Sequence, residues 1–135
     1  MREILFKAKR KDNGEWVEGS LIIAEGSVAY IIRSKSKAFI PKGESIICSA
    51  ECYEINPDTL CQYTGLTDKN GRKIWENDIV HCETKLRVSW HHFKASWVLS
   101  KKGWLYNHFF GEDVEPEDVE VVGNILDNAE LLEVE

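Results

Sequence analysis

The residues best suited to binding a metal ion are four cysteines and a neighbouring histidine: Cys48, Cys52, Cys61, Cys82 and His81. Structural zinc sites usually contain closely spaced ligand pairs such as Cys-x-x-Cys, and no such pair occurs here. Cys48 and Cys52 fall in an apparent strand, where residues four apart share a face but lie about 13 Å from each other. That separation is too large for one tetrahedral ion. We therefore predict small, buried, reduced cysteines and no metal site.

Catalysis would need a nucleophile beside a histidine and an orienting acid, or a pair of carboxylates held apart from other charges. The four histidines, at positions 81, 91, 92 and 108, have no recognisable motif around them. Carboxylate pairs such as Glu117 and Asp118 lie in an acidic run, which we interpret as a solvated surface. The sequence contains no glycine-rich loop of the kind that binds phosphates. We therefore expect a protein that is not an enzyme and uses no cofactor.

The uneven distribution of charge indicates a binding surface. The chain has 17 Lys and Arg against 23 Asp and Glu, but ten of the acids fall in residues 112–135, which contain no base. Residues 84–111 contain five Lys or Arg, no acid, three Trp and three Phe. Basic side chains interleaved with aromatic rings are typical of single-stranded nucleic-acid binding. The residues that would bind are Trp90, Lys94, Trp97, Lys101, Lys102 and Trp104.

Two questions about these segments stay open at the level of sequence. Small β-barrels need large aromatic side chains in their cores, so we favour interior positions for most rings of residues 84–111 over an exposed binding face. The acidic residues 112–135 can be solvated, which we favour, or can lie against the basic strands of the same chain or of a neighbouring subunit. Exposed tryptophans would indicate a ligand surface, and buried ones a scaffold.

Hydrophobic alternation with a period of two residues predicts β-strands along almost the whole chain. The strand-like segments are 3–9, 16–23, 28–32, 38–40, 45–55, 59–66, 72–75, 79–83, 86–90, 95–99 and 104–108. Turn residues separate them. Asp12-Asn13-Gly14 suits a type I′ turn with two consecutive positive φ angles, and Asn70-Gly71 is the strongest hairpin signal in the sequence.

A helix is the competing interpretation of one stretch, because Trp90, Trp97 and Trp104 recur every seven residues. We reject it, since the matching d positions are mostly polar and Gly103 would lie inside the helix. Only residues 127–132 are predicted to be helical, as one short turn with Asp127 as the N-cap.

With 135 residues, 43% of them hydrophobic and 30% charged, the chain suits one ordinary domain or two very small ones. We expect an all-β fold with an N-terminal subdomain over residues 1–56, a second over 57–126 and an acidic helical tail over 127–135. The first boundary is placed at Pro57, because proline interrupts strand pairing. No apolar run approaches the length of a membrane span, and no secretory signal accompanies the cysteines. We therefore expect a cytoplasmic protein that does not bind membranes.

Residues 57–80 carry an ordered set of residues with narrow backbone roles: Gln-Tyr-Thr-Gly-Leu at 62–66, Asp-x-Asn-Gly at 68–71, and Trp-Glu-Asn-Asp-Ile at 75–79. This segment resembles the signature of the YopX family, short proteins of bacteriophages and prophages. The segments 2–8 and 122–132 also look like the ends of that family. Two positions depart from the family pattern, Trp75, where Tyr or Phe is commoner, and Asn77, where Gly is usual. Asn is the next-best residue for a left-handed conformation.

The resemblance implies an SH3-like barrel in the C-terminal part, a bacterial host cell and no established biochemical function. It supplies no catalytic residues. We interpret the motif residues as structural: Gln62, Tyr63, Thr64, Gly65, Asp68, Asn70, Gly71, Glu76 and Asp78. Our leading hypothesis is a phage or prophage accessory protein that binds a protein partner or self-assembles. Single-stranded nucleic-acid binding is the alternative.

Overall fold

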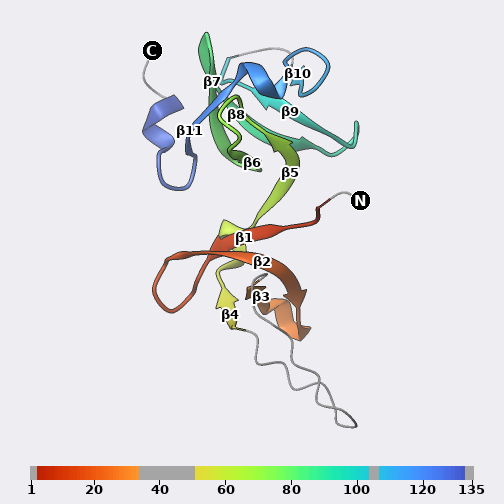
Figure 1. Ribbon diagram of the computed structural model, residues 1–135. Helices are drawn as coiled ribbons and strands as arrows, with labels where there is room; N and C mark the ends of the chain where they lie inside the picture. The colour runs from red at the N-terminus through yellow and green to blue at the C-terminus, as the bar shows by residue number, and fades with distance from the viewer. Residues whose placement is uncertain (1–2, 34–50, 104–106, 133–135) are drawn as a thin grey trace. The chain divides into compact units, whose positions relative to one another are not determined.

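The computed structural model describes residues 3–33, 51–103 and 107–132, and antiparallel strands form most of it (Figure 1). The all-β prediction is confirmed, and the described helical elements are short 3-10 turns. None of these turns is long and apolar enough to cross a membrane. The predicted strands at 38–40, at 45–50 and at 104–106 lie outside the described residues.

The chain divides into two compact units within a strand, between Gln62 and Tyr63. Residues 57–62, which we expected in the second subdomain, therefore belong to the first unit. The first unit is an antiparallel sheet whose strands run in the order β4-β3-β2-β1-β5. Their bounds are β1 Phe6–Lys9, β2 Trp16–Ile23, β3 Ala29–Arg33, β4 Cys52–Ile55 and β5 Cys61–Thr67, of which Cys61 and Gln62 pair with β1. Two 3-10 turns, η1 Glu25–Ser27 and η2 Pro57–Thr59, complete it.

Alternating residues of these strands form the core of the first unit. The buried cluster consists of Ala8, Val17, Ala29, Ile31 and Ile55. Every strand from β1 to β4 contributes to this cluster, as the period-two pattern predicts.

The first hairpin turn differs from the type I′ turn that we predicted. Gly14 has a positive φ of 73°, but Asn13 does not. The Gly14 N–H donates to the Arg10 carbonyl at 2.9 Å, and the Arg10 N–H donates to the Glu15 carbonyl at 2.8 Å. Residues 11–14 thus form a longer loop. The prediction was wrong because a four-residue loop can reverse the chain with a single left-handed residue.

The second unit contains a five-stranded antiparallel sheet with the order β10-β9-β8-β7-β11. Its strands are β7 Asp78–Cys82, β8 Thr84–His91, β9 Ser96–Ser100, β10 His108–Phe109 and β11 Glu120–Asn124. The end of β5 pairs with β6 (Lys73–Trp75), and η3 (Pro116–Asp118) precedes β11. The core cluster consists of Ile74, Val80, Leu86, Val88, Leu99, Phe110, Val119 and Val121.

The last described element of the acidic C-terminal segment is a 3-10 turn, η4 (Ala129–Leu132), at the place where we predicted a helical turn. The Asn124 side-chain oxygen accepts the backbone N–H groups of Leu126 and Asp127 at 3.0 and 2.9 Å. This part of the acidic segment lies on β8, so it is not wholly solvated as we had favoured.

Candidate functional site

Asp68 is the most constrained polar residue of the central motif. Its side chain is buried, with 4% exposure. Oδ1 accepts the backbone N–H groups of Asn70 at 2.9 Å and Arg72 at 2.8 Å, and Oδ2 accepts that of Val121 at 2.9 Å. Burial raises the pKa of the Asp68 carboxyl, but the three N–H groups and the charge of Arg72 together lower it below its ordinary value. The carboxylate joins the turn after β5 to β11.

Thr64 and Asp78 also bond to the backbone. The Thr64 hydroxyl donates to the Ile74 carbonyl at 2.7 Å and accepts the Leu66 N–H at 3.1 Å. Oδ2 of Asp78 accepts the Trp75 N–H at 2.8 Å. Both side chains are buried. Through these contacts, the two side chains hold β5, β6 and β7 in place.

The other motif residues lie around the same strands. Gly65 and Gly71 have positive φ angles of 86° and 78°, and Asn77, which stands where the family usually has Gly, has a φ of 71°. Tyr63 and Trp75 face each other across β5 and β6 with ring centroids 5.5 Å apart. Three further members complete the set: Gln62 and Glu76 are half-buried, and Asn70 is exposed.

The cysteines do not form a metal centre within the described part of the chain, where no group of three or more metal-ligating side chains occurs. Cys61 is buried and Cys82 half-buried, whereas Cys52 is exposed. The prediction of a buried side chain was wrong for Cys52, because this residue begins β4, which is an edge strand of its sheet. Cys48 lies outside the described residues.

Exposed aromatic rings gather at the turn end of the β8–β9 hairpin, residues 90–97, which we call the hairpin end. Trp90 lies opposite Trp97, with ring centroids 5.0 Å apart and an interplanar angle of 69°. Trp97 is half-buried and packs against the core, while Trp90 is 46% exposed. Phe93, in the turn, is 91% exposed. The hairpin end thus has one anchored ring and two rings that face solvent.

The structure places the residues that we predicted for nucleic-acid binding in two groups. Lys94 lies at the hairpin end with Trp90 and Trp97. Lys101 and Lys102 follow β9 at its opposite end. Trp104 lies outside the described residues. The described members therefore do not all gather around the exposed rings.

Lys101 and Lys102 line a hollow of about 810 Å³, which we call the basic hollow. Its lining residues are Arg87, Ser100, Lys101, Lys102, Ile125, Ala129 and Leu132. The Lys101 ammonium donates to the Thr84 hydroxyl at 3.0 Å, and the Arg87 guanidinium donates to the Asn77 side-chain oxygen at 3.0 Å. Sequence reasoning missed the hollow because its two walls come from distant parts of the chain.

Comparison with protein families identifies the chain. A family model described as "YopX protein" matches residues 5–133. The chain belongs to the YopX family. The resemblance that we drew from residues 57–80 therefore extends to both units of this YopX-family protein.

The fold of this YopX-family protein is similar to that of an experimentally determined structure, the "Crystal structure of protein EF1440 from Enterococcus faecalis". The TM-score is 0.62 and the sequence identity 21%, and the match covers 98% of this chain and 99% of that chain. At this identity the similarity shows the fold alone. No curated protein matches the sequence.

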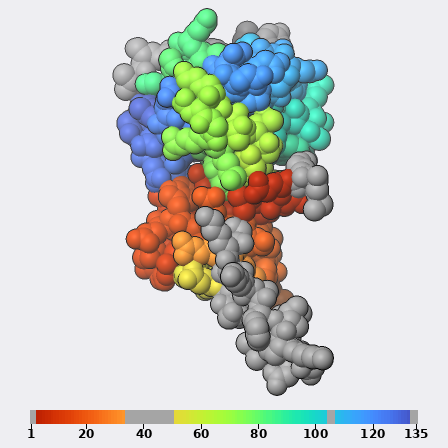
Figure 2. All heavy atoms as spheres, viewed as in Figure 1, coloured from red at the N-terminus to blue at the C-terminus, as the bar shows by residue number. Residues whose placement is uncertain are grey.

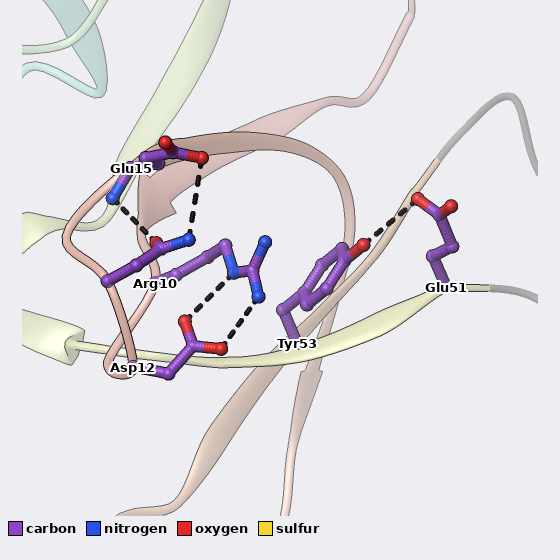
Figure 3. A network of polar contacts seen from close by, with 6 residues as sticks. Arg10, Asp12, Glu15, Glu51 and Tyr53 are labelled. Atoms are coloured by element: carbon purple, nitrogen blue, oxygen red, sulfur yellow. Dashed lines mark hydrogen bonds and ion pairs between the residues drawn. The ribbon is translucent and has the colours of Figure 1, made fainter.

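The first unit of this YopX-family protein carries a polar network on β4 and the first hairpin turn (Figure 3). The Arg10 guanidinium lies 3.9 Å from the centre of the Tyr53 ring and donates to both carboxylate oxygens of Asp12 at 2.9 and 2.6 Å. The Tyr53 hydroxyl donates to Glu51 at 3.1 Å, and Arg33 pairs with Glu51 at 2.7 Å. The hydrogen bond from Arg10, with its charge, holds the pKa of Asp12 below its ordinary value. Within this network, Arg10 is paired with Asp12 and Arg33 is paired with Glu51.

Proposed function

We propose that this YopX-family protein is a non-enzymatic accessory module of a phage or prophage, which acts by binding a protein partner or by self-assembly. The supporting observation is the solvent exposure of Phe93 (91%) and Trp90 (46%) at the hairpin end. Covering a large apolar side chain contributes about 1.5–3 kcal/mol. A partner that covers both rings would therefore gain a substantial part of its binding energy from two residues.

Internal contacts order the hairpin end before any partner binds. The Lys94 N–H donates to Nδ1 of His91 at 3.1 Å, and the His91 ring lies 6.4 Å from the Phe109 ring. Trp97 supports Trp90 from the core side. Aromatic residues held in this way lose little conformational freedom on binding, and such residues contribute strongly to protein interfaces.

The buried motif residues support a non-enzymatic role that needs no cofactor. The acceptor oxygens described for Asp68, Asp78 and Thr64 all receive backbone N–H groups. A carboxylate held by the backbone in this way contributes to the strand arrangement, which is the role that we assign to it.

Phe93→Ser tests the proposal. We expect it to lower partner capture from a lysate of the bacterial host by at least about tenfold, because the most exposed ring is removed. The matched control is Ile23→Ser in the first unit, which removes an apolar side chain that is 70% exposed. Equal loss in both variants, or a wild-type protein that is a lone monomer with no captured partner, would contradict the proposal.

Single-stranded nucleic-acid binding is the second candidate, and the exposed Lys94 beside Trp90 and Phe93 favours it. Here the rings would stack on bases and the lysine would contact phosphate. Titration with a labelled oligonucleotide at low salt should then give an affinity that falls as salt rises, and Lys94→Gln should weaken binding and reduce the salt dependence. Absence of binding, or binding insensitive to salt, would rule it out.

We further propose that the second unit is an SH3-like barrel and that the protein acts in the cytoplasm of the bacterial host. The five-stranded antiparallel sheet, the short β5–β6 pair and the bulge between Val121 and Gly123 support the barrel. Backbone hydrogen bonds that join β10 to β5 or β6 in an experimental structure would establish closure, and an open edge at β10 would exclude it.

A further inference from the structure

The basic hollow combines cations with an apolar wall. Arg87, Lys101 and Lys102 supply the charge, and Ile125 and Leu132 supply apolar surface. Within the described part of the chain, Arg87 and Lys102 form no ion pair with an acid. A ligand that fits both features carries carboxylates next to apolar side chains, which is the chemistry of an acidic protein segment.

The second unit itself presents such a segment, residues 112–118, which we call the acidic turn. Five of its residues are exposed acids: Glu112, Asp113, Glu115, Glu117 and Asp118. Between them lie Val114 and Pro116, both half-buried. Figure 2 shows the lighter blue residues of this part of the chain on the surface of the second unit.

Backbone contacts hold the acidic turn in one conformation. The Gly111 N–H donates to the Val114 carbonyl at 2.8 Å, and the Phe109 N–H donates to the Asp113 carboxylate at 2.8 Å. The 3-10 turn η3 closes it. An acidic segment ordered in advance loses less conformational entropy when it enters a hollow than a free peptide does.

The acidic turn and the basic hollow lie on opposite sides of the β8–β9 pair. Val114 packs with the core cluster, to which Val88 and Leu99 contribute. Arg87 precedes Val88 by one residue, Ser100 follows Leu99 by one residue, and the two are paired in the register. Because side chains alternate between the two sides of a strand, both lie on the other side of the sheet. The turn therefore cannot reach the hollow of its own chain, and its complementary surface is available only on another copy.

We propose that the basic hollow of one copy binds the acidic turn of a second copy. The apolar wall favours this occupant over the phosphates of a nucleic acid. Because the two surfaces differ, a single contact leaves one turn and one hollow free, so copies build a chain or ring or close as a pair that exchanges turns. The proposal rests on the protein-binding or self-assembling function proposed above and specifies the surfaces that a self-assembling form uses.

Charge reversal tests the contact in the full-length protein. We expect the molar mass of the wild type, measured by light scattering, to rise with concentration and to fall with added salt. Lys102→Glu in the hollow and Glu117→Lys in the turn should each weaken association at least about tenfold, because each places like charges against each other. Lys11→Glu, the same charge change at an exposed lysine of the first unit, is the matched control and should associate like the wild type. Thermal melts should show that all three variants are folded.

A mixture of variants gives the sharpest result. Lys102→Glu retains a normal acidic turn, and Glu117→Lys retains a normal hollow. Each variant alone should be monomeric, whereas an equimolar mixture should associate again. The normal turn of Lys102→Glu fits the normal hollow of Glu117→Lys, and the two reversed charges are also opposite in sign. Recovery of association in the mixture would support the contact directly.

The other outcomes overturn the proposal in distinguishable ways. Association that survives both reversals, or that is lost equally in Lys11→Glu, would show self-assembly through another surface and leave the proposed function standing. A wild type that is monomeric at all concentrations but captures a host protein through Phe93 would exclude this contact alone. Monomers without any partner would exclude both proposals. Salt-dependent oligonucleotide binding lost in Lys102→Glu, without self-association, would assign the hollow to nucleic acid instead.

Discussion

Gly19→Ala is expected to destabilise the first unit by about 3 kcal/mol or more, the upper range for a side chain forced into filled space. Gly19 lies in β2 against β3, and a Cβ atom there would overlap the carbonyl oxygen of Ile32 and lie 2.7 Å from its carbon. The Cα of Arg33 would be 3.1 Å away. These obstacles are backbone atoms, so no side-chain rotation relieves them. The strands must separate.

Hydrogen exchange can locate the damage. Amides of β2 and β3 should lose protection in Gly19→Ala, while those of β7, β8 and β9, which belong to the second unit and its own core, should keep it. Ser20→Ala is the control, because Ser20 is the exposed next residue of the same strand and its change should stay within about 0.5 kcal/mol. Equal stability of the two variants in urea would show that β2 and β3 are not packed as closely as the structure indicates.

The sequence predicted most strands because their alternation is regular, and it missed β11 because that strand is embedded in acids. Val119 and Val121 are buried with 0% and 6% exposure, and Glu120 between them pairs with Lys69 at 3.7 Å. The alternation is therefore present, but only two buried residues express it. Ten acids in the surrounding 24 residues dominate any local average and indicate a solvated surface.

The candidate surfaces were harder to predict than the strands. Alternation correctly places Trp90 and Trp97 opposite each other on one side of the hairpin. It does not show how far the neighbouring elements cover that side, which makes Trp97 half-buried and leaves Trp90 46% exposed. The basic hollow has no local signal, because Lys102 and Leu132 come to line it together only after the chain has formed β11 and turned back.

Asp68→Asn is expected to destabilise the second unit by about 2–4 kcal/mol, the range for losing charge-assisted hydrogen bonds of a buried carboxylate. The Asn amide has one oxygen, so it can serve either the turn at Asn70 and Arg72 or the Val121 N–H. In both orientations an amide NH2 group faces a backbone donor. Asp118→Asn, at an exposed carboxylate of the same unit, is the control and should match the wild type within about 0.5 kcal/mol.

The pH dependence separates this explanation from a general packing defect. The pKa of Asp68 is lowered in the folded state, because the N–H groups of Val121, Arg72 and Asn70 outweigh its burial. Its contribution to stability is therefore complete above the ordinary Asp pKa, about 3.9, and is lost as the pH falls through the lower folded value. Urea unfolding between pH 7 and pH 2 should accordingly show the wild type and Asp68→Asn converging at low pH. A difference that stays constant over this range would mean that shape, and not the charge of Asp68, holds β11 to the turn.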